Sequence, residues 1–110
     1  PFDEENRYDL LICVANWPAS RSQAWHVLLE ARGIENQCFV AGVNRLSEDG
    51  NGIQYDGGSA IIDPMGKVLI KKNKEEAIIQ NVLHRETIIN TRKKFPFLED
   101  ADHFIIKLKS

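Results

Sequence analysis

Residues 8–44 read YDLLICVANWPASRSQAWHVLLEARGIENQCFVAGVN, and this stretch decides the fold. Residues 10–15 form an unbroken apolar run, which is typical of a strand buried on both faces and predicts a central strand. A second strand-like apolar segment begins near Cys38. The residues between the two segments are numerous enough for a helix, so the stretch predicts a strand, a helix and a second strand.

The predicted helix follows the Asn-Trp-Pro segment at residues 16–18, because proline cannot donate a hydrogen bond to a strand ladder. Ser20 and Gln23 have the spacing of a capping box, so we expect the helix to begin at Ser20. One face of this helix is predicted to hold Trp25, Leu28, Leu29 and Arg32. Gly33 either caps the helix in the left-handed conformation or lies inside it at a cost of about 1 kcal/mol.

The two strands are expected to pair in parallel with a right-handed crossover, because an antiparallel partner would not need so long a connection. Parallel strands end at the same edge of a sheet, and ligands of open α/β sheets bind outside that edge. Asn16-Trp17 and Asn44-Arg45 follow the two strands. We therefore expect these residues to meet at the rim of a pocket.

Turn signals and hydrophobic periodicity predict the rest of the chain. In order, they predict a surface loop at 45–52, a short buried strand at 59–62, a turn at 63–66, a returning strand at 68–70, a polar turn at 71–74, a strand within 76–83 and a helix at 85–94. Pro96 is expected to stop that helix. In the tail, residues 104–106 could add an edge strand or reach a partner subunit.

Composition sets further bounds. The chain has 110 residues, of which 43% are hydrophobic, and is therefore one domain or part of one. Its net charge of -2 and its short basic clusters make nucleic acid a poor partner. The longest apolar run is too short for a membrane span, and no leader segment precedes it, so we expect a soluble, cytoplasmic protein. The opening residues lack an initiator methionine and any regular pattern, so the chain is expected to begin within a fold.

The candidate nucleophiles and metal ligands are few. Cys13 and Cys38 lie in apolar strand segments, where a reactive thiolate is not expected, so we interpret both as core residues in a reducing compartment. Neither these cysteines nor His26, His84 and His103 have zinc-site spacing, so we expect no metal and no cofactor. His26 is expected at the surface or at an interface.

An ordered series of short segments resembles the carboxyl-terminal half of the carbon-nitrogen hydrolases, the nitrilase superfamily. The segments are residues 14–18, 24–25, 28–29, 31–32, 34–37, 44–45, 58–59 and 63–66. Within that superfamily, ANWP at 15–18, DGNG at 49–52, RKKFP at 92–96 and DAD at 100–102 are similar to the omega-amidase branch. The similarity covers nearly the whole chain.

This resemblance implies an α/β fold, namely the carboxyl-terminal half of an α-β-β-α sandwich. The expected parts are a mixed sheet, a strand-helix-strand crossover, a hairpin and a C-terminal helix. It also implies a cysteine nucleophile, a glutamate base and a lysine, all in the missing amino-terminal half, so no catalytic residue is expected in this chain. The family usually has alanine at Gly33, which favours a continuous helix to about Asn36, and it places this helix at a homodimer interface.

Three residues are predicted to bind substrate. Asn16 and Trp17 combine a strand-end position with the matching family position, although a loop tryptophan packed on the core is an alternative. Arg21 could face an acidic substrate group, because omega-amidases act on dicarboxylate monoamides and a guanidinium suits a carboxylate. The alternative for Arg21 is a solvated arginine in the first helical turn.

Two arginines have other expected roles. Arg32 shares the apolar helix face, so we expect a buried guanidinium that needs an anion, with Glu35 as the candidate partner. Such an ion pair would lie under the active-site wall or at the dimer interface. Asn44 and Arg45 could contact the substrate or only close the strand, and the sequence leaves both alternatives open.

The leading hypothesis is therefore the carboxyl-terminal portion of an amidase that cleaves a small linear amide through a cysteine thioester and releases ammonia. Its expected partners are the amide substrate, a second subunit and the missing amino-terminal half. The isolated chain is expected to be inactive. The alternatives are a stand-alone, non-catalytic α/β module that binds a ligand or partner, and a thiol enzyme that uses Cys13 or Cys38.

Overall fold

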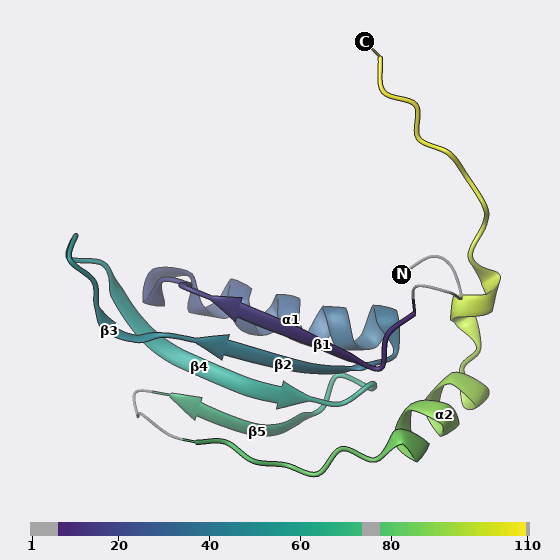
Figure 1. Ribbon diagram of the computed structural model, residues 1–110, viewed down its shortest axis with the longest axis horizontal. Coiled ribbons are helices and arrows are strands. Elements are labelled where there is room, and N and C mark those ends of the chain that lie inside the picture. Colours follow the sequence, from purple (N-terminus) through teal and green to yellow (C-terminus); the bar gives the residue numbers. More distant parts are fainter. Residues whose placement is uncertain (1–6, 74–77, 110) are drawn as a thin grey trace.

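A computed structural model describes residues 7–73 and 78–109 of the chain. The elements, in order, are β1 (Leu10–Ala15), the 3-10 turn η1 (Ala19–Arg21), α1 (Ser22–Asn36), β2 (Phe39–Asn44), β3 (Leu46–Glu48), β4 (Gln54–Ile62), β5 (Val68–Asn73), α2 (Arg85–Lys94) and the 3-10 turn η2 (Phe97–Asp100). Figure 1 shows a curved sheet with α1 along one face, while the chain after η2 runs away from the sheet.

The sheet is mixed, with the strand order β1-β2-β4-β3 and with β5 also paired to β4. β1 and β2 are parallel and in register from Leu10 opposite Phe39 to Ala15 opposite Asn44. The other pairs are antiparallel, and the turn at residues 63–66 joins β4 to β5. The expected parallel crossover, hairpin and C-terminal helix are therefore confirmed, as is the α/β class.

The core lies between α1 and the sheet. Trp25 and Leu29 of α1 are buried against Cys38, Val40, Ala60 and Ile62. Gly42 of β2 allows this close approach, because a Cβ atom there would lie 2.5 Å from Leu29 Cδ1. The indole Nε1 of Trp25 donates a hydrogen bond to Gly58 O at 2.9 Å, so the helix is also fixed to the backbone of β4.

α1 passes through Gly33 without interruption, as the resemblance implied. The left-handed residue that ends the helix is Gln37, with φ 47°. Gly33 is buried, and a Cβ atom there would lie 3.0 Å from Asp63 O in the β4–β5 turn. Close packing of the helix against this turn therefore accounts for the glycine.

Two expectations about this stretch are wrong. β1 is an edge strand within the described residues, and its exposure alternates, with Ile12 and Val14 at 61% and 77% exposed. Only the α1 side of β1 is covered, so the apolar run does not mark a strand buried on both faces here. The capping box at Ser20 is also absent: the 3-10 turn η1 comes first, closed by a hydrogen bond from Arg21 N to Pro18 O, and α1 begins without a side-chain cap.

The middle of the chain contains more strand than expected. The tight turn after residue 48 is present, but β3 precedes it and pairs with the first residues of β4. β4 begins at Gln54 and passes through Gly57 and Gly58, which have φ of 77° and 74° at a register shift. β5 likewise extends into the predicted polar turn, to Asn73. Two successive glycines suggested a break in the strand, and the structure accommodates them as a bulge.

For the C-terminal region, some of the predicted elements are present and others are absent. α2 has the predicted bounds and ends before Pro96. The strand expected within 76–83 is absent from residues 78–83, and residues 74–77 lie outside the described part of the chain. The edge strand considered for 104–106 is absent too. Among the described residues, no helix has the length and apolar character that a membrane span requires.

Candidate functional site

The carboxyl ends of β1 and β2 meet at the side chain of Asn44. Its Oδ1 accepts a hydrogen bond from Trp17 N at 2.7 Å, and its Nδ2 donates to Trp17 O at 2.9 Å and to Gly57 O at 2.8 Å. Asn44 is only 8% exposed. Both amide hydrogens and the carbonyl oxygen are thus engaged within the protein. Of the two alternatives for Asn44, the structure therefore has the one in which it closes the strand.

The main chain around Asn44 is held as well. Asn44 N donates to Ser59 Oγ at 3.0 Å, and the bulge at Gly57 and Gly58 turns two carbonyl groups of β4 toward the first half of the chain. Gly57 O accepts from Asn44, and Gly58 O accepts from Trp25. Three segments, namely the loop after β1, the end of β2 and the middle of β4, are therefore joined by hydrogen bonds at this edge of the sheet.

Trp17 and Arg21 lie together beside this edge. Trp17 Nε1 donates to Arg21 O at 2.6 Å, and the guanidinium carbon of Arg21 lies 5.4 Å from the centre of the Trp17 ring, which is a cation–π distance. The Trp17 ring also contacts Trp25, with ring centres 5.8 Å apart. Trp17 is thus half-buried against the core while Arg21 and Asn16 are exposed. The structure brings Trp17 and Arg21 into contact and leaves Asn16 next to them at the surface.

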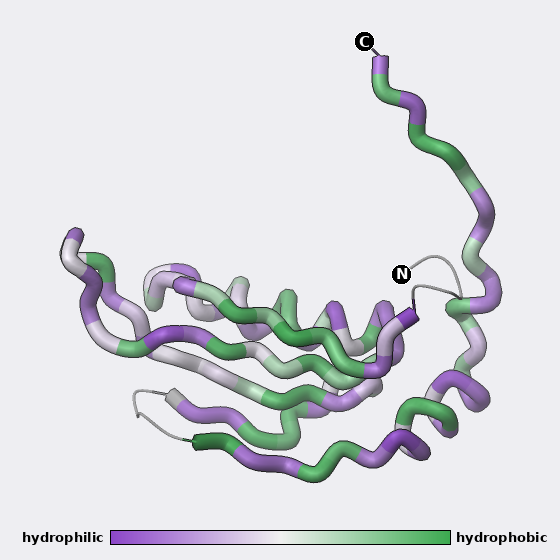
Figure 2. Tube along the Cα trace, in the orientation of Figure 1, coloured by the Kyte–Doolittle hydropathy of each residue, from purple (hydrophilic) through white to green (hydrophobic). Residues whose placement is uncertain are grey.

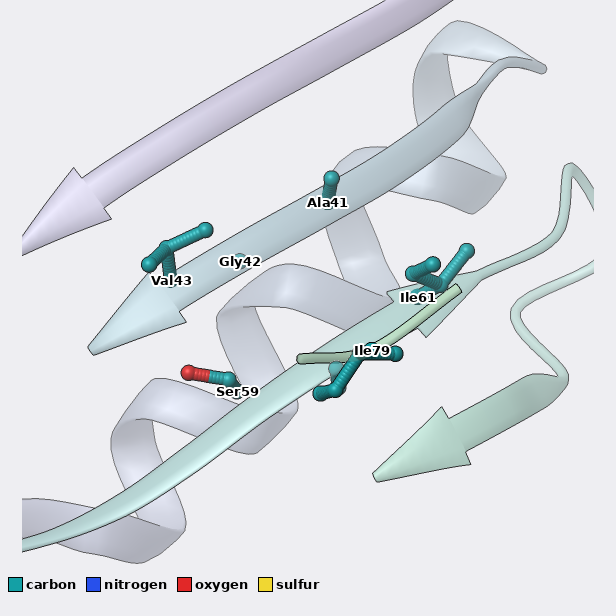
Figure 3. Close-up of a pocket in the computed structure, with 7 residues that line it drawn as sticks. Ala41, Gly42, Val43, Ser59, Ile61 and Ile79 are labelled. Atoms are coloured by element: carbon teal, nitrogen blue, oxygen red, sulfur yellow. The ribbon is translucent and has the colours of Figure 1, made fainter. Parts of the chain in front are cut away.

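A cavity of about 210 Å³ lies on the other face of the sheet (Figure 3). It is lined by Ala41, Gly42, Val43, Ser59, Ala60, Ile61 and Ile79. Ile79 lies in front of the sheet and α1 behind it, so the cavity opens away from the helix. The lining includes one hydroxyl group and no ionisable side chain, and none of the three predicted substrate-binding residues lines it.

The sheet face around this cavity is apolar and largely uncovered. Figure 2 shows hydrophobic stretches side by side on β1, β2 and β4. The pairing places Ile12 beside Ala41 and Ala41 beside Ile61, with Val14 beside Val43. Half of a sandwich is expected to expose a sheet face of this kind, although the apolar run of β1 alone does not distinguish it from a strand that is covered on both sides.

The two cysteines do not form a nucleophilic site in the described structure. Cys38 is fully buried, and burial raises the pKa of its thiol to about 11. Cys13 is half-buried on the α1 side of β1. A high thiol pKa leaves little thiolate at neutral pH, and the thiolate is the reactive form.

We therefore expect Cys38 to resist alkylation by iodoacetamide at pH 8 in the folded protein, where about one thiol in a thousand would be ionised. Peptide mass spectrometry measures the labelled fraction, and the same protein in urea is the control in which Cys38 should react. The pKa is raised, so reactivity should increase as the pH approaches 11. Rapid labelling of folded Cys38 at pH 8 would support the thiol-enzyme alternative instead.

The remaining charged candidates have structural partners. Arg32 Nη1 lies 2.6 Å from Glu35 Oε1, so the expected ion pair is present. Its burial is not: the two side chains are 45% and 54% exposed, and such a pair contributes about 0–1 kcal/mol. The guanidinium carbon of Arg45 lies over the ring of Tyr55, 4.7 Å from the ring centre.

His26 and the acidic residues add no further site. His26 is half-buried, and this burial is the main cause that lowers its pKa. The positive charge of Lys71 lowers the pKa further. Across residues 7–73 and 78–109, histidine, cysteine, aspartate and glutamate side chains do not gather in a group of three that could hold a metal ion. The polar edge at Asn44, Trp17 and Arg21 is therefore the candidate site of the described chain.

The sequence and the fold agree with one protein family. The model of the carbon-nitrogen hydrolase family matches residues 6–93. The chain therefore belongs to the carbon-nitrogen hydrolases, and its sheet with α1 has the fold of solved members.

Similar proteins include two named amidases. Omega-amidase YafV of Escherichia coli K12 is 47% identical over 100 residues, which are 90% of this chain and 39% of that protein. The 2-oxoglutaramate amidase of Bacillus subtilis is 37% identical over 92 residues, which are 84% of this chain and 35% of that protein.

A solved structure matches closely as well. XC1258 of Xanthomonas campestris, a CN-hydrolase superfamily protein with an arsenic adduct in its active site, superposes with a TM-score of 0.87 and 41% identity. The match covers 91% of this chain and 38% of that chain. This chain therefore spans about two fifths of the length of the relatives it matches.

Proposed function

We propose that these residues are the carboxyl-terminal portion of an amidase that hydrolyses a small linear amide and releases ammonia. The observation that carries the proposal is the uncovered apolar sheet face, which a sandwich fold would cover with a second sheet. The names of two relatives, an omega-amidase and a 2-oxoglutaramate amidase, support the choice of an amide substrate. The match to 39% of the E. coli relative supports a larger enzyme.

The proposed chemistry uses groups from the amino-terminal portion. A glutamate takes the proton of a cysteine thiol, and the resulting thiolate attacks the amide carbon to form a tetrahedral oxyanion, which a lysine and a backbone N–H stabilise. The oxyanion collapses to a thioester as the C–N bond breaks and the nitrogen leaves as ammonia, with its proton supplied by a glutamate. Water then attacks the thioester with the glutamate as base, which releases the carboxylate product and the thiol.

In this proposal the described chain supplies one wall of the substrate pocket. Asn16, Trp17 and Arg21 lie where the carboxyl ends of two parallel strands meet, the usual place for a ligand in an open α/β sheet. A dicarboxylate monoamide such as 2-oxoglutaramate has a carboxylate at the end opposite the amide. The exposed guanidinium of Arg21 can accept that carboxylate as a bidentate partner.

The proposal includes a homodimer in the cytoplasm. Val27, Leu28 and Ile34 are all exposed on α1, on parts of the helix surface that do not face the core. Apolar residues gathered on an exposed helix are typical of a protein interface, which supports pairing through α1. The two free thiols suit a reducing compartment.

The proposal is tested by adding the missing portion. The amino-terminal portion of the E. coli relative can be joined to these 110 residues, and we refer to this joined polypeptide as the complete enzyme. We expect the complete enzyme to release ammonia from 2-oxoglutaramate, whereas the 110-residue chain and the amino-terminal portion are each inactive alone. An enzyme-coupled ammonia assay measures this.

The control is the complete enzyme with its nucleophilic cysteine replaced by alanine, which should be inactive. Amide hydrolysis by the 110-residue chain alone would contradict the proposal that the catalytic residues lie in the amino-terminal portion. A stand-alone binding module would instead be monodisperse and would melt cooperatively without the added portion, which size-exclusion chromatography and a thermal melt would detect.

A further inference from the structure

We propose that Asn44 is a positioning residue of the active site, which fixes the main chain of Trp17 and, through Trp17, the guanidinium of Arg21. The inference rests on the proposed function, in which Arg21 binds the substrate carboxylate. Asn44 is the residue that keeps Arg21 in the position which that contact requires. It concerns a residue that does not touch the substrate itself.

The first step is the hold of one side chain on one peptide segment. The Asn44 carboxamide accepts from Trp17 N at 2.7 Å and donates to Trp17 O at 2.9 Å. It therefore bonds to both polar main-chain groups of the same residue, as a neighbouring strand would do. The loop leaves the sheet at this point, and Pro18, which follows, has no N–H to continue a ladder.

The second step is the rigidity of Asn44 itself. Its Nδ2 also donates to Gly57 O at 2.8 Å, and its main-chain N donates to Ser59 Oγ at 3.0 Å. Asn44 is nearly buried at the end of β2, where parallel pairing places it beside Ala15. Asn44, which holds Trp17, is thus bonded to β4 twice, once through its side chain and once through its main-chain N–H.

The third step leads from Trp17 to Arg21. The indole Nε1 of Trp17 donates to Arg21 O at 2.6 Å, and Arg21 N donates to Pro18 O at 3.0 Å. The guanidinium then lies over the same indole ring, which Trp25 supports from the core. The main chain and the charged head of Arg21 both depend on where Trp17 lies.

Other side chains at position 44 do not reproduce this arrangement. Aspartate has no hydrogens to donate, so it would place a carboxylate against Trp17 O and Gly57 O. Alanine would leave buried polar groups of Trp17 and Gly57 without partners. A displacement of about 1 Å in a positioned group can reduce a rate about a hundredfold, so freeing the loop should be visible in kinetics.

The experiment measures kcat/KM of the complete enzyme for two amides of equal chain length, glutaramate and pentanamide, which differ only in that a carboxylate replaces the terminal methyl group. The ratio of the two values reports recognition of the distal carboxylate. We expect Asn44→Ala to lower this ratio about tenfold or more, mainly through a higher KM for the substrate that carries the carboxylate. Arg21→Gln should lower the ratio similarly, and Asn44→Ala should lower it no further in that background.

The matched control is Thr91→Val, which removes a hydroxyl that is as buried as Asn44 and donates to Thr87 O in α2. It should leave the ratio unchanged, since loss of a buried hydrogen bond elsewhere does not move Arg21. If Asn44→Ala does not fold, Trp17→Phe removes the indole donation to Arg21 O, keeps an aromatic ring at position 17, and should lower the ratio by itself.

Two results overturn different parts. A normal ratio in Asn44→Ala and Trp17→Phe, with a lowered ratio in Arg21→Gln, overturns the positioning role and leaves the proposed function intact. A normal ratio in Arg21→Gln overturns the proposed carboxylate contact, and the inference that depends on it.

Discussion

The 110-residue chain carrying Ile12→Asp is expected to lose its assembly with the amino-terminal portion. Ile12 lies on β1 on the open face of the sheet, where its side chain is 61% exposed in this chain. In the proposed sandwich this side chain is covered by the second sheet. A charged residue at such an interface would be buried without a partner, so the effect on assembly should be close to complete.

The magnitude follows from two contributions. Covering an isoleucine side chain contributes about 1.5–3 kcal/mol, and this contribution is lost. Burying an unpaired carboxylate costs several kcal/mol more unless it takes up a proton. Their sum exceeds about 2.8 kcal/mol, which is a hundredfold in an association constant at roughly 1.4 kcal/mol for each factor of ten, so we expect assembly to fall by more than a hundredfold.

Co-purification measures this result. The chain is produced with an affinity tag alongside the untagged amino-terminal portion, and the recovered amount of the latter is compared between variants. The matched control is Ile53→Asp, because Ile53 is also a partly exposed isoleucine but lies in the loop between β3 and β4. Equal recovery with Ile12→Asp and with the unchanged chain would contradict a second layer on this face.

Trp25→Ala is expected to lower the free energy of unfolding by about 3–5 kcal/mol. The indole is buried between α1 and the sheet, in contact with the core cluster and with Trp17. Its removal leaves a large void and also deprives Gly58 O of its donor. Both effects act on the same element pair, so α1 should loosen from the sheet.

Urea unfolding of the complete enzyme, followed by circular dichroism, measures the change. Trp25→Phe keeps most of the ring volume and loses only the indole N–H, so it should cost about 1–3 kcal/mol. The difference between the two variants separates the packing of the ring from the hydrogen bond. A Trp25→Ala protein within about 1 kcal/mol of the unchanged protein would show that this residue does not anchor the helix.

The first half of the fold could be predicted because its signals are local. The proline after Trp17 and the apolar run before it mark the end of β1, and the length of the link requires a parallel partner. Besides the exposed face of β1 and the absent capping box at Ser20, one error concerned the burial of Arg32. The buried stripe of α1 runs through Trp25, Leu29 and Gly33, at steps of four residues, so Arg32 lies to one side of it and reaches solvent.

The errors in the second half arise where pairing, rather than local pattern, decides the structure. Residues 78–83 contain isoleucine and valine as a strand would, but they have no ladder partner within the described chain. β3 has only three residues, and its signal was the turn Asp49 to Gly52 between two segments that could pair. Interpreting that turn as a β-hairpin would have predicted β3.

The candidate site was predicted in part. Strand-end and family position selected Asn16 and Trp17, the acidic substrate expected for the family selected Arg21, and the role of Asn44 was left open. The structure brings Trp17, Arg21 and Asn44 to one edge. The double hydrogen bond from Asn44 to Trp17 could not be predicted, because it depends on the bulge in β4 that turns Gly57 O toward Asn44. Whether Asn16, Trp17 or Arg21 contacts substrate stays a prediction.

The two glycines of that bulge connect properties that are usually independent. Gly57 O accepts a hydrogen bond from Asn44 Nδ2, and Gly58 O accepts one from the indole of Trp25 in α1. Both glycines have a positive φ. A side chain at Gly57 would also meet Leu46 Cδ2 at 2.9 Å. In the proposed enzyme, heat resistance and substrate selectivity should therefore decline together when either glycine is changed, because both depend on the same bend of β4.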